Sequence, residues 1–363
     1  MALQAGIVGL PNVGKSTLFN ALTAAGAESA NYPFCTIDPN IGIVNVPDPQ
    51  LLALADIVQP KKVVPTFVEF VDIAGLVKGA SAGEGLGNQF LAHIRETHAI
   101  AHLVRCFSGD DVTHISGQID PIQGIEVINT ELLLADLETV ERAFDKAVRQ
   151  AKTNDKDAAI WRDLLQRVLF ALEVGTPVRN LEFESRDKTL LEGIHLITAK
   201  PVMYVANLAE DGKEENPDLD RVRAFAEKEG SPVVALCAAL EAELAQLDPE
   251  DQAEYLRELG LTEPGLDRVI AAAYAVLSLQ TFYTAGPEET RAWTVRRGSN
   301  AYDAAGEIHT DFQKGFIRAE VIGFEQFIAR RGEQGAKEAG EMRLEGKEYV
   351  LADGDVVHFR FNV

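Results

Sequence analysis

The residues with the clearest chemistry are residues 9–17, which read Gly-Leu-Pro-Asn-Val-Gly-Lys-Ser-Thr. They fit the pattern G-x-x-x-x-G-K-[ST], which is typical of a loop that binds phosphate. Gly9 and Gly14 let backbone N–H groups close around phosphate oxygens, and the positive end of a following helix attracts the anion. We expect Lys15 to reach the β- and γ-phosphates and the Ser16 hydroxyl to bind Mg²⁺. Residues 9–17 are called the phosphate loop below.

The residues on either side of the phosphate loop supply the context that this motif requires. Residues 3–8 predict a buried strand, and residues 15–25 predict a helix with Leu18, Phe19 and Leu22 on one face. The loop therefore connects a strand to a helix, which supports the interpretation as a nucleotide site. The loop residues expected to bind the nucleotide are Asn12, Val13, Gly14, Lys15, Ser16 and Thr17.

A second apolar run, residues 67–71, ends in Asp72-Ile-Ala-Gly75. After a phosphate loop, D-x-x-G has a mechanical interpretation: Asp72 holds a Mg²⁺-bound water, and the Gly75 N–H contacts the γ-phosphate. Thr36 lies between the two motifs, in a segment of the kind that γ-phosphate and Mg²⁺ order. We expect Thr36 to be a Mg²⁺ ligand, with an ordinary turn threonine as the alternative.

Alternating strand and helix patterns position these motifs. Strands are predicted at 41–46, 101–107, 200–207 and 233–239, and helices at 49–58, 88–99, 217–229, 249–258 and 264–276. Such alternation predicts an α/β domain with a mostly parallel sheet and helices on both faces. Ligands of such sheets bind at the carboxyl ends of the strands, where Gly9, Asp72, Asn207 and Ala238 are expected.

Two parts of the chain depart from this alternation. Residues 121–195 carry two apolar stripes at helical spacing with a polar turn between them, which predicts an inserted helical hairpin. From about residue 278, strand patterns at 291–295, 316–322, 346–351 and 355–361 surround a short helix at 300–308. We therefore expect a nucleotide-binding domain over 1–277, with the insertion inside it, and a small α+β domain over 278–363.

Composition excludes some classes of function. The formal net charge of −22 argues against indiscriminate nucleic-acid binding, so no DNA partner is expected. No apolar run approaches the roughly 18 residues of a membrane span. Three widely spaced cysteines and the lack of a secretory pattern at the start favour a reducing, cytoplasmic setting.

Taken together, these motifs resemble the Obg-like ATPase (YchF) family of translation-factor-class P-loop proteins over the whole chain. The specific parts are the phosphate loop, Asn-Tyr-Pro-Phe-Cys-Thr at 31–36, the run of 72–80 followed by Gly-Glu-Gly-Leu-Gly, and the tail of 353–363. The resemblance implies a P-loop NTPase domain, a coiled-coil-like insertion and a C-terminal ubiquitin-like β-grasp domain of the TGS type. It also implies ATP hydrolysis and association with the ribosome, through rRNA or ribosomal proteins.

The base site can be assessed from its residues. Guanine-specific relatives carry N-K-x-D after the corresponding strand, and the Asp accepts hydrogen bonds from guanine N1 and N2. Here the stretch is Asn207-Leu208-Ala209-Glu210, so the Lys is lost and the acid is one methylene longer. Asn207 can pair with the N6/N7 edge of adenine, and the Leu208 carbonyl can accept from N6. ATP is therefore expected over GTP.

The hydrolytic residues also depart from the common pattern. Small GTPases place a Gln after D-x-x-G to orient water, whereas this chain has Leu76. Either the resting rate is low or another group acts. His114, near a strand end, is the candidate, with an exposed loop histidine as the alternative.

A monovalent cation is a second cofactor candidate beside Mg²⁺. The side-chain carbonyl of Asn12 is placed to coordinate K⁺ beside the phosphates, and in related P-loop proteins an Asn here accompanies potassium dependence; stabilisation of the loop backbone is the alternative. We predict a Mg²⁺-dependent P-loop ATPase that acts as a conformational switch on the translation apparatus. A GTP-binding RNA or ribosome factor, and a nucleotide-gated binding module with negligible turnover, remain alternatives.

Overall fold

The structure is a computed structural model that describes residues 3–25, 40–73, 86–107, 120–152, 156–210 and 216–362. Contacts divide the chain into two compact units. The first comprises Met1–Ile43 and Glu69–Ala273, and the second comprises Val44–Val68 and Tyr274–Val363. The domain limits expected from the sequence stay a prediction, but residues 44–68 group with the C-terminal part of the chain rather than with their sequence neighbours.

The first unit is built on a six-stranded sheet with the strand order β2-β4-β1-β5-β6-β7. Strand β1 pairs in parallel with β4 and β5, and the ladder continues in parallel through β6 and β7. This arrangement confirms the expected P-loop α/β fold. The strands are β1 (Gln4–Val8), β2 (Ile41–Asn45), β4 (Phe67–Asp72), β5 (Ala99–Arg105), β6 (Val202–Asn207) and β7 (Val233–Leu236).

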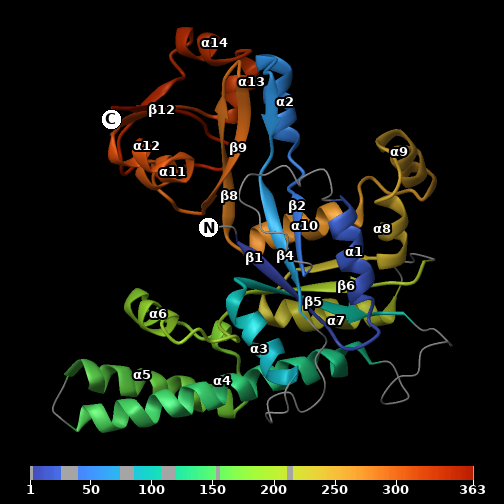
Figure 1. The fold of residues 1–363 in the computed structure, drawn as a ribbon, viewed down its shortest axis with the longest axis vertical. Coiled ribbons are helices and arrows are strands. Elements are labelled where there is room, and N and C mark those ends of the chain that lie inside the picture. The colour runs from blue at the N-terminus through green and yellow to red at the C-terminus, as the bar shows by residue number, and fades with distance from the viewer. Residues whose placement is uncertain are drawn as a thin grey trace. The chain divides into compact units, whose positions relative to one another are not determined.

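Helices accompany this sheet along the chain (Figure 1). Helix α1 begins at Lys15 and α7 spans Pro217–Glu229, both as the sequence predicts. The remaining helices of this part are α3 (Leu86–Glu96), α6 (Ser185–Glu192), α8 (Ala238–Leu244), α9 (Pro249–Glu258) and α10 (Gly265–Val276). Among the helices that the structure describes, none combines the length with the apolar composition that a membrane-spanning segment requires.

The predicted helical hairpin is confirmed as α4 (Pro121–Ala151) packed against α5 (Lys156–Glu173). Figure 1 shows the two helices running side by side. Asp120 caps α4 by accepting hydrogen bonds from the N–H groups of Ile122 and Gln123, and Pro121 takes the first position, where no donor is needed. The apolar stripes meet between the helices, with Val140, Leu165 and Val168 fully buried.

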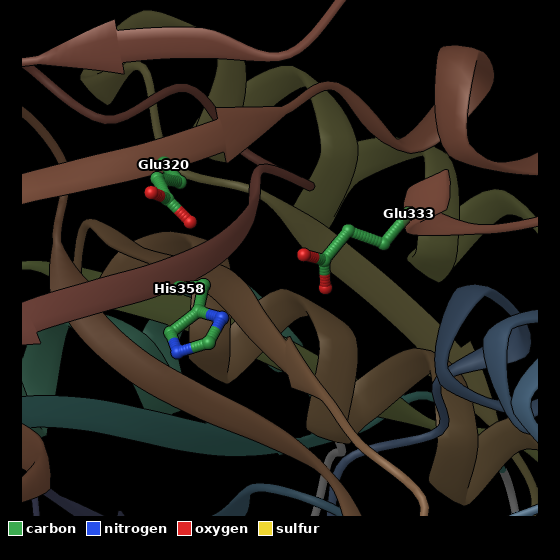
Figure 2. A group of neighbouring side chains, drawn as sticks. All are labelled: Glu320, Glu333 and His358. Atoms are coloured by element: carbon green, nitrogen blue, oxygen red, sulfur yellow. The ribbon is translucent and has the colours of Figure 1, made fainter. Parts of the chain in front are cut away.

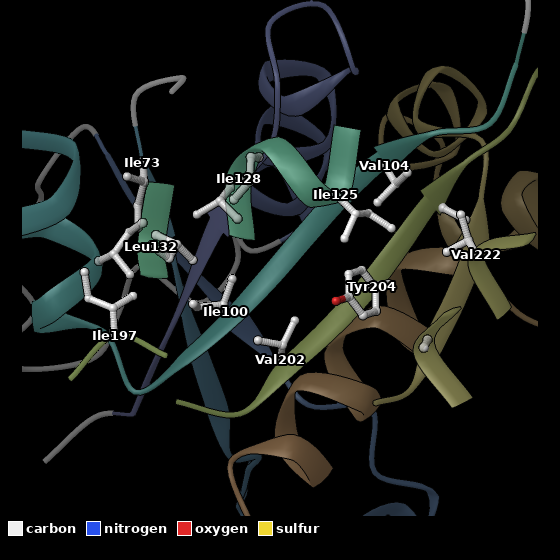
Figure 3. Packing of buried hydrophobic residues seen from close by; sticks show 14 of the residues in the cluster. Ile73, Ile100, Val104, Ile125, Ile128, Leu132, Ile197, Val202, Tyr204 and Val222 are labelled. Atoms are coloured by element: carbon white, nitrogen blue, oxygen red, sulfur yellow. The ribbon is translucent and has the colours of Figure 1, made fainter. Parts of the chain in front are cut away.

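One core cluster lies between the sheet and the helices α3, α4 and α7, as Figure 3 shows for its labelled residues. Its labelled members are Ile73, Ile100, Val104, Ile125, Ile128, Leu132, Ile197, Val202, Tyr204 and Val222. The strand register aligns the carboxyl ends of the strands: Ile7 stands beside Asp72, and Asn207 stands between Arg105 and Leu236. Side chains that follow these residues therefore gather at one edge of the sheet.

The second unit contains a sheet with the order β11-β10-β12-β8-β9-β3. The hairpin β8–β9 is antiparallel, and β12 lies parallel to β8 and antiparallel to β10, as expected for a β-grasp fold. Its strands are β3 (Lys62–Val64), β8 (Leu279–Ala285), β9 (Glu289–Arg296), β10 (Phe316–Ile322), β11 (Arg343–Glu345) and β12 (Val356–Phe361). Its helices are α2 (Pro49–Val58), α11 (Ala301–Ile308), α12 (Thr310–Lys314), α13 (Phe324–Ala329) and α14 (Glu333–Glu338).

The strand predicted at residues 346–351 is wrong. The ladder with β10 uses Arg343–Glu345 instead, and Val350 makes only an isolated bridge to Asn300. Val350 is 57% exposed, so its apolar side chain contributes little to the core. The apolar residues in this stretch indicated a strand, but Gly346 begins a turn before them.

His102, in β5, is a buried titratable group of the first unit. Its side chain is 2% exposed and its ring lies 5.5 Å from that of Tyr204. Burial, and then the charge of Arg179, lower the pKa of His102 to about 3. The unfolded chain therefore binds a proton near pH 6.5 that the folded chain does not, so stability falls as the pH falls below that value.

We predict that His102 alone accounts for about 2 kcal/mol of the unfolding free energy lost between pH 7 and pH 5. In His102→Gln this part of the pH dependence should disappear, because Gln does not titrate. Chemical denaturation at both pH values measures the difference. His93→Gln, at an exposed position of α3, is the matched control and should keep the wild-type pH dependence. Equal pH dependence in His102→Gln and the wild type would contradict the assignment.

Candidate functional site

The phosphate loop lies between the end of β1 at Val8 and the start of α1 at Lys15. Two of its residues have left-handed backbone angles: Asn12 with φ of 64° and Gly14 with φ of 94°. Gly14 tolerates this conformation at no steric cost, and Asn is among the few side-chain-bearing residues that adopt it readily. The Gly14 carbonyl accepts the Leu18 N–H at 2.9 Å, which begins the helix. Successive turns of this kind direct backbone N–H groups toward an anion.

Asn207, the last residue of β6, fixes this loop through its side-chain amide. Its Nδ2 donates to the Val13 carbonyl at 2.9 Å, and its Oδ1 accepts the Ala238 N–H at 2.9 Å. The residue is 4% exposed. The amide therefore joins the phosphate loop to the segment after β7. Sequence reasoning placed Asn207 at this edge of the sheet, but it did not predict that both ends of its amide contact the backbone.

Lys15 and Asp72, predicted from two separate motifs, are brought together. The Lys15 Nζ donates to Asp72 Oδ1, and both side chains are largely buried. The pair lies where β4 ends beside β1, so the register of the sheet produces the contact. Lys15 begins α1, and the hydroxyl-bearing residues Ser16 and Thr17 follow it in the first turn of that helix.

Several predicted site residues lie outside the described residues: Thr36, Gly75 and His114, together with Leu76. Their expected roles stay predictions. Of the base-site residues, Leu208 is 7% exposed and its N–H donates to the Leu236 carbonyl at 2.7 Å. Glu210 lies two residues further on, at a turn, and is exposed.

Arg105 is a site residue that sequence reasoning missed. It ends β5, is 3% exposed, and donates to the Asn12 carbonyl at 3.4 Å and to the Phe107 carbonyl at 3.2 Å. The available signal was a lone cation at the end of an otherwise largely apolar strand, at the sheet edge where Asp72 and Asn207 also lie.

The second unit carries a different group of ligand-type side chains, shown in Figure 2. Glu320, Glu333 and His358 each place one ligand atom within 4.8 Å of the others. However, the Glu320 carboxylate already pairs with Arg360 at 2.9 Å and with Arg318 at 3.3 Å. The hydrogen bond from Arg360 comes first among the causes that lower the pKa of Glu320. Two guanidinium groups beside the carboxylate disfavour a divalent cation, so the group is an ion-pair network.

Comparison with known proteins identifies close relatives over the full length. The chain is 58% identical to "Ribosome-binding ATPase YchF" of Pasteurella multocida over 363 residues, covering 100% of both chains. It is 55% identical to the protein of the same name in Bacillus subtilis over 366 residues, again covering 100% of both. A family model described as "50S ribosome-binding GTPase" matches residues 4–130, and a YchF C-terminal model described as "Protein of unknown function (DUF933)" matches residues 279–362.

Solved structures agree with these relatives. The "Structure of the Schizosaccharomyces pombe YchF GTPase" superimposes with a TM-score of 0.89 at 36% identity, covering 99% of this chain and 97% of that one. A "GTP binding protein from Pyrococcus horikoshii OT3" gives a TM-score of 0.63 at 22% identity and supports the fold alone.

The close contact between Gly14 and Asn207 yields a sharp prediction. A Cβ added at Gly14 would lie 2.4 Å from Asn207 Nδ2, so Gly14→Ala must displace the amide as well as strain a left-handed residue. We expect Gly14→Ala to reduce the unfolding free energy by about 2–4 kcal/mol and to weaken nucleotide binding at least about tenfold. Denaturant titration and calorimetric binding measure the two effects.

Gly230→Ala is the matched control for that experiment. Gly230 has φ of 66° and nothing within 4 Å of an added Cβ, so its substitution brings only the backbone strain. We expect about 1 kcal/mol of destabilisation and unchanged nucleotide binding. Equal losses of stability in the two variants would show that the Asn207 contact contributes nothing.

Proposed function

Because the chain belongs to the YchF family, we propose that it binds ATP, hydrolyses it to ADP and phosphate, and acts as a nucleotide-dependent switch at the ribosome. The observation that carries the proposal is the phosphate loop, whose Val13 carbonyl is bonded to Asn207 while Lys15 stands at its end. Such a loop presents N–H groups and an ammonium to a phosphate chain. The ribosome is the proposed partner and the cytoplasm the proposed location.

The names of the relatives differ about the nucleotide, so the base site must be argued from its contacts. One hydrogen of the Asn207 amide is used by Val13, and the other can donate to purine N7, which adenine and guanine share. Asn207 therefore favours a purine without choosing between the two. Its Oδ1 already accepts from Ala238, so we assign recognition of the adenine N6 amine to the Leu208 carbonyl.

Glu210 supports ATP over GTP. Guanine recognition needs an acceptor for N1 and N2 held at one fixed distance, and a site built for that bond discriminates strongly. Glu210 is exposed at a turn and one methylene longer than the Asp of guanine-specific sites. GTP is consequently the second candidate substrate.

Mg²⁺ is the proposed metal, because hydroxyl and carboxylate oxygens are the ligands it prefers. Ser16 and Thr36 would bind it directly and Asp72 through a water, and the Asp72 carboxylate already attracts a cation, the Lys15 ammonium. When bound, Mg²⁺ neutralises charge that develops on the phosphates. Lys15 then exchanges Asp72 for phosphate oxygens, and Asn12 to Thr17 hold the phosphate chain in place.

The hydrolytic roles rest on the residue types alone. The Gly75 N–H is proposed to contact the γ-phosphate, and His114 to orient the attacking water, because Leu76 cannot do so through its side chain.

Steady-state hydrolysis of ATP and GTP, with and without ribosomes, tests this function directly. We expect turnover of ATP, tighter binding of ATP than of GTP in competition, and a loss of turnover of about a hundredfold or more in Lys15→Met. Lys146→Met, at an exposed position of α4, should keep wild-type activity and serves as the control.

Three results would change the proposal. Full activity in a folded Lys15→Met would remove the phosphate assignment. Tight ATP binding with no turnover under any condition would favour the nucleotide-gated binding module. Stronger binding of GTP than of ATP would favour a GTP-dependent ribosome factor.

K⁺ is proposed as a further cofactor at Asn12, a residue of the phosphate loop with a left-handed backbone. A monovalent cation beside the phosphates would stabilise the charge of the transition state. We expect ATP turnover about tenfold faster in K⁺ than in Na⁺ at equal ionic strength, and we expect Asn12→Ala to abolish this preference. Equal rates in both salts would end the K⁺ proposal, and a preference that survives Asn12→Ala would move the cation elsewhere.

A further inference from the structure

Arg105 is a buried cation for which the described part of the chain offers no matching anion. It is 3% exposed at the end of β5, every residue of which is buried. Burial lowers the pKa of its guanidinium, because removing the charged group from water disfavours the protonated form. A buried charge of this kind persists only where other interactions compensate for its lost hydration.

The partners of Arg105 are carbonyl groups and not an acid. Nη1 donates to the Asn12 carbonyl at 3.4 Å and Nε to the Phe107 carbonyl at 3.2 Å, while the guanidinium lies 4.3 Å from the centre of the Phe107 ring. Nη2 is buried and has no hydrogen-bond partner among the described residues. Within the same ranges Arg105 forms no ion pair, so no acid of the described residues neutralises its positive charge.

The geometry of the peptide unit connects Arg105 to the anion side of the phosphate loop. A trans peptide is planar, and its C=O and N–H point in opposite directions. The Asn12 carbonyl and the Val13 N–H belong to one peptide unit. Because Arg105 draws the Asn12 carbonyl toward the sheet, the Val13 N–H is turned away from it.

The next two peptide units are held in the same way by other partners. The Val13 carbonyl is bonded to Asn207, which turns the Gly14 N–H outward, and the Gly14 carbonyl is bonded to the Leu18 N–H, which orients the N–H of Lys15. The N–H groups of three consecutive residues are therefore oriented by hydrogen bonds to the carbonyl of the same peptide unit. Arg105 controls the first of the three.

We propose that Arg105 is a positioning residue of the phosphate loop, which aims the Val13 N–H at the β-phosphate by holding the Asn12 carbonyl. The inference rests on the proposed function and adds a residue that does not itself touch the nucleotide. Its positive charge also compensates part of the phosphate charge from beneath the loop. The effect is confined to groups that contact phosphate, so the base should bind as before.

Binding of ADP and of AMP to Arg105→Met separates positioning from a general structural role. Met has a similar length and packs well, but donates no hydrogen bond. Because AMP lacks the β-phosphate, we expect ADP affinity to fall about tenfold and AMP affinity to stay within about twofold of the wild type. Isothermal calorimetry gives both values, and thermal melting reports on folding.

Two further variants make the experiment decisive. Arg268→Met is the matched control, because Arg268 also donates to a backbone carbonyl, that of Ala235 at 3.0 Å, and also has a buried Nε without a partner among the described residues. It should leave both affinities unchanged. Arg105→Lys keeps the charge but not the forked donors, so a partial loss of ADP affinity, about threefold, is expected. If Arg105→Met does not fold, the ADP and AMP affinities of Arg105→Lys test the positioning role instead.

The outcomes distinguish the inference from the function beneath it. ADP binding at wild-type strength in a folded Arg105 variant, or equal losses for ADP and AMP, would overturn the positioning role while leaving the proposed function intact. A wild-type protein that binds neither ADP nor ATP would overturn both.

Discussion

The site depends on the hydrogen bonds of one buried amide, that of Asn207. An amide can donate and accept at once, and Asn207 uses both capacities on the backbone, at Val13 and at Ala238. A shorter or charged side chain would leave one of these buried backbone groups without a partner, at a cost of about 1–3 kcal/mol. The amide thus sets the distance between the phosphate loop and the segment after β7, and the remaining contacts of the site depend on that spacing.

The parallel sheet is what allows so few contacts to build a site. Its register places Asp72 beside β1 and Asn207 between Arg105 and Leu236, so residues more than a hundred positions apart in the chain end at one edge. The interior of the sheet is largely apolar, with His102 as an exception, and the polar groups of the site lie where the strands end and backbone groups need partners. Asp72, Arg105 and Asn207 each occupy such a position. The strand ends are therefore the positions where polar side chains both complete backbone hydrogen bonds and become available to a ligand.

Much of this arrangement could be predicted from the sequence, because its signals are local. The cap and proline at Asp48 and Pro49 mark the start of α2, and the glycines with Lys15 mark the phosphate loop. The hydrogen-bond partners of the side chains could not be predicted. Asn207 was read as a base contact because its amide suits adenine, and nothing in the sequence shows that Val13 and Ala238 use that amide first. Arg105 was overlooked because a single cation in an apolar strand forms no pattern.

In the second unit, the sequence predicts helix α2 but does not show which distant residues the helix contacts. Helix α2 was correctly predicted, yet its partners lie far along the chain: the Tyr283 hydroxyl donates to Asp48 at 2.9 Å across 235 positions. Asp48 also accepts the Leu51 N–H, so one side chain both caps α2 and bonds it to Tyr283 in β8. Burial raises the pKa of Tyr283, so the phenol keeps its proton at neutral pH and donates it to Asp48. The sequence near residues 48–58 is therefore sufficient to predict that α2 forms. Where α2 packs depends on the hydrogen bond between its cap, Asp48, and the distant Tyr283.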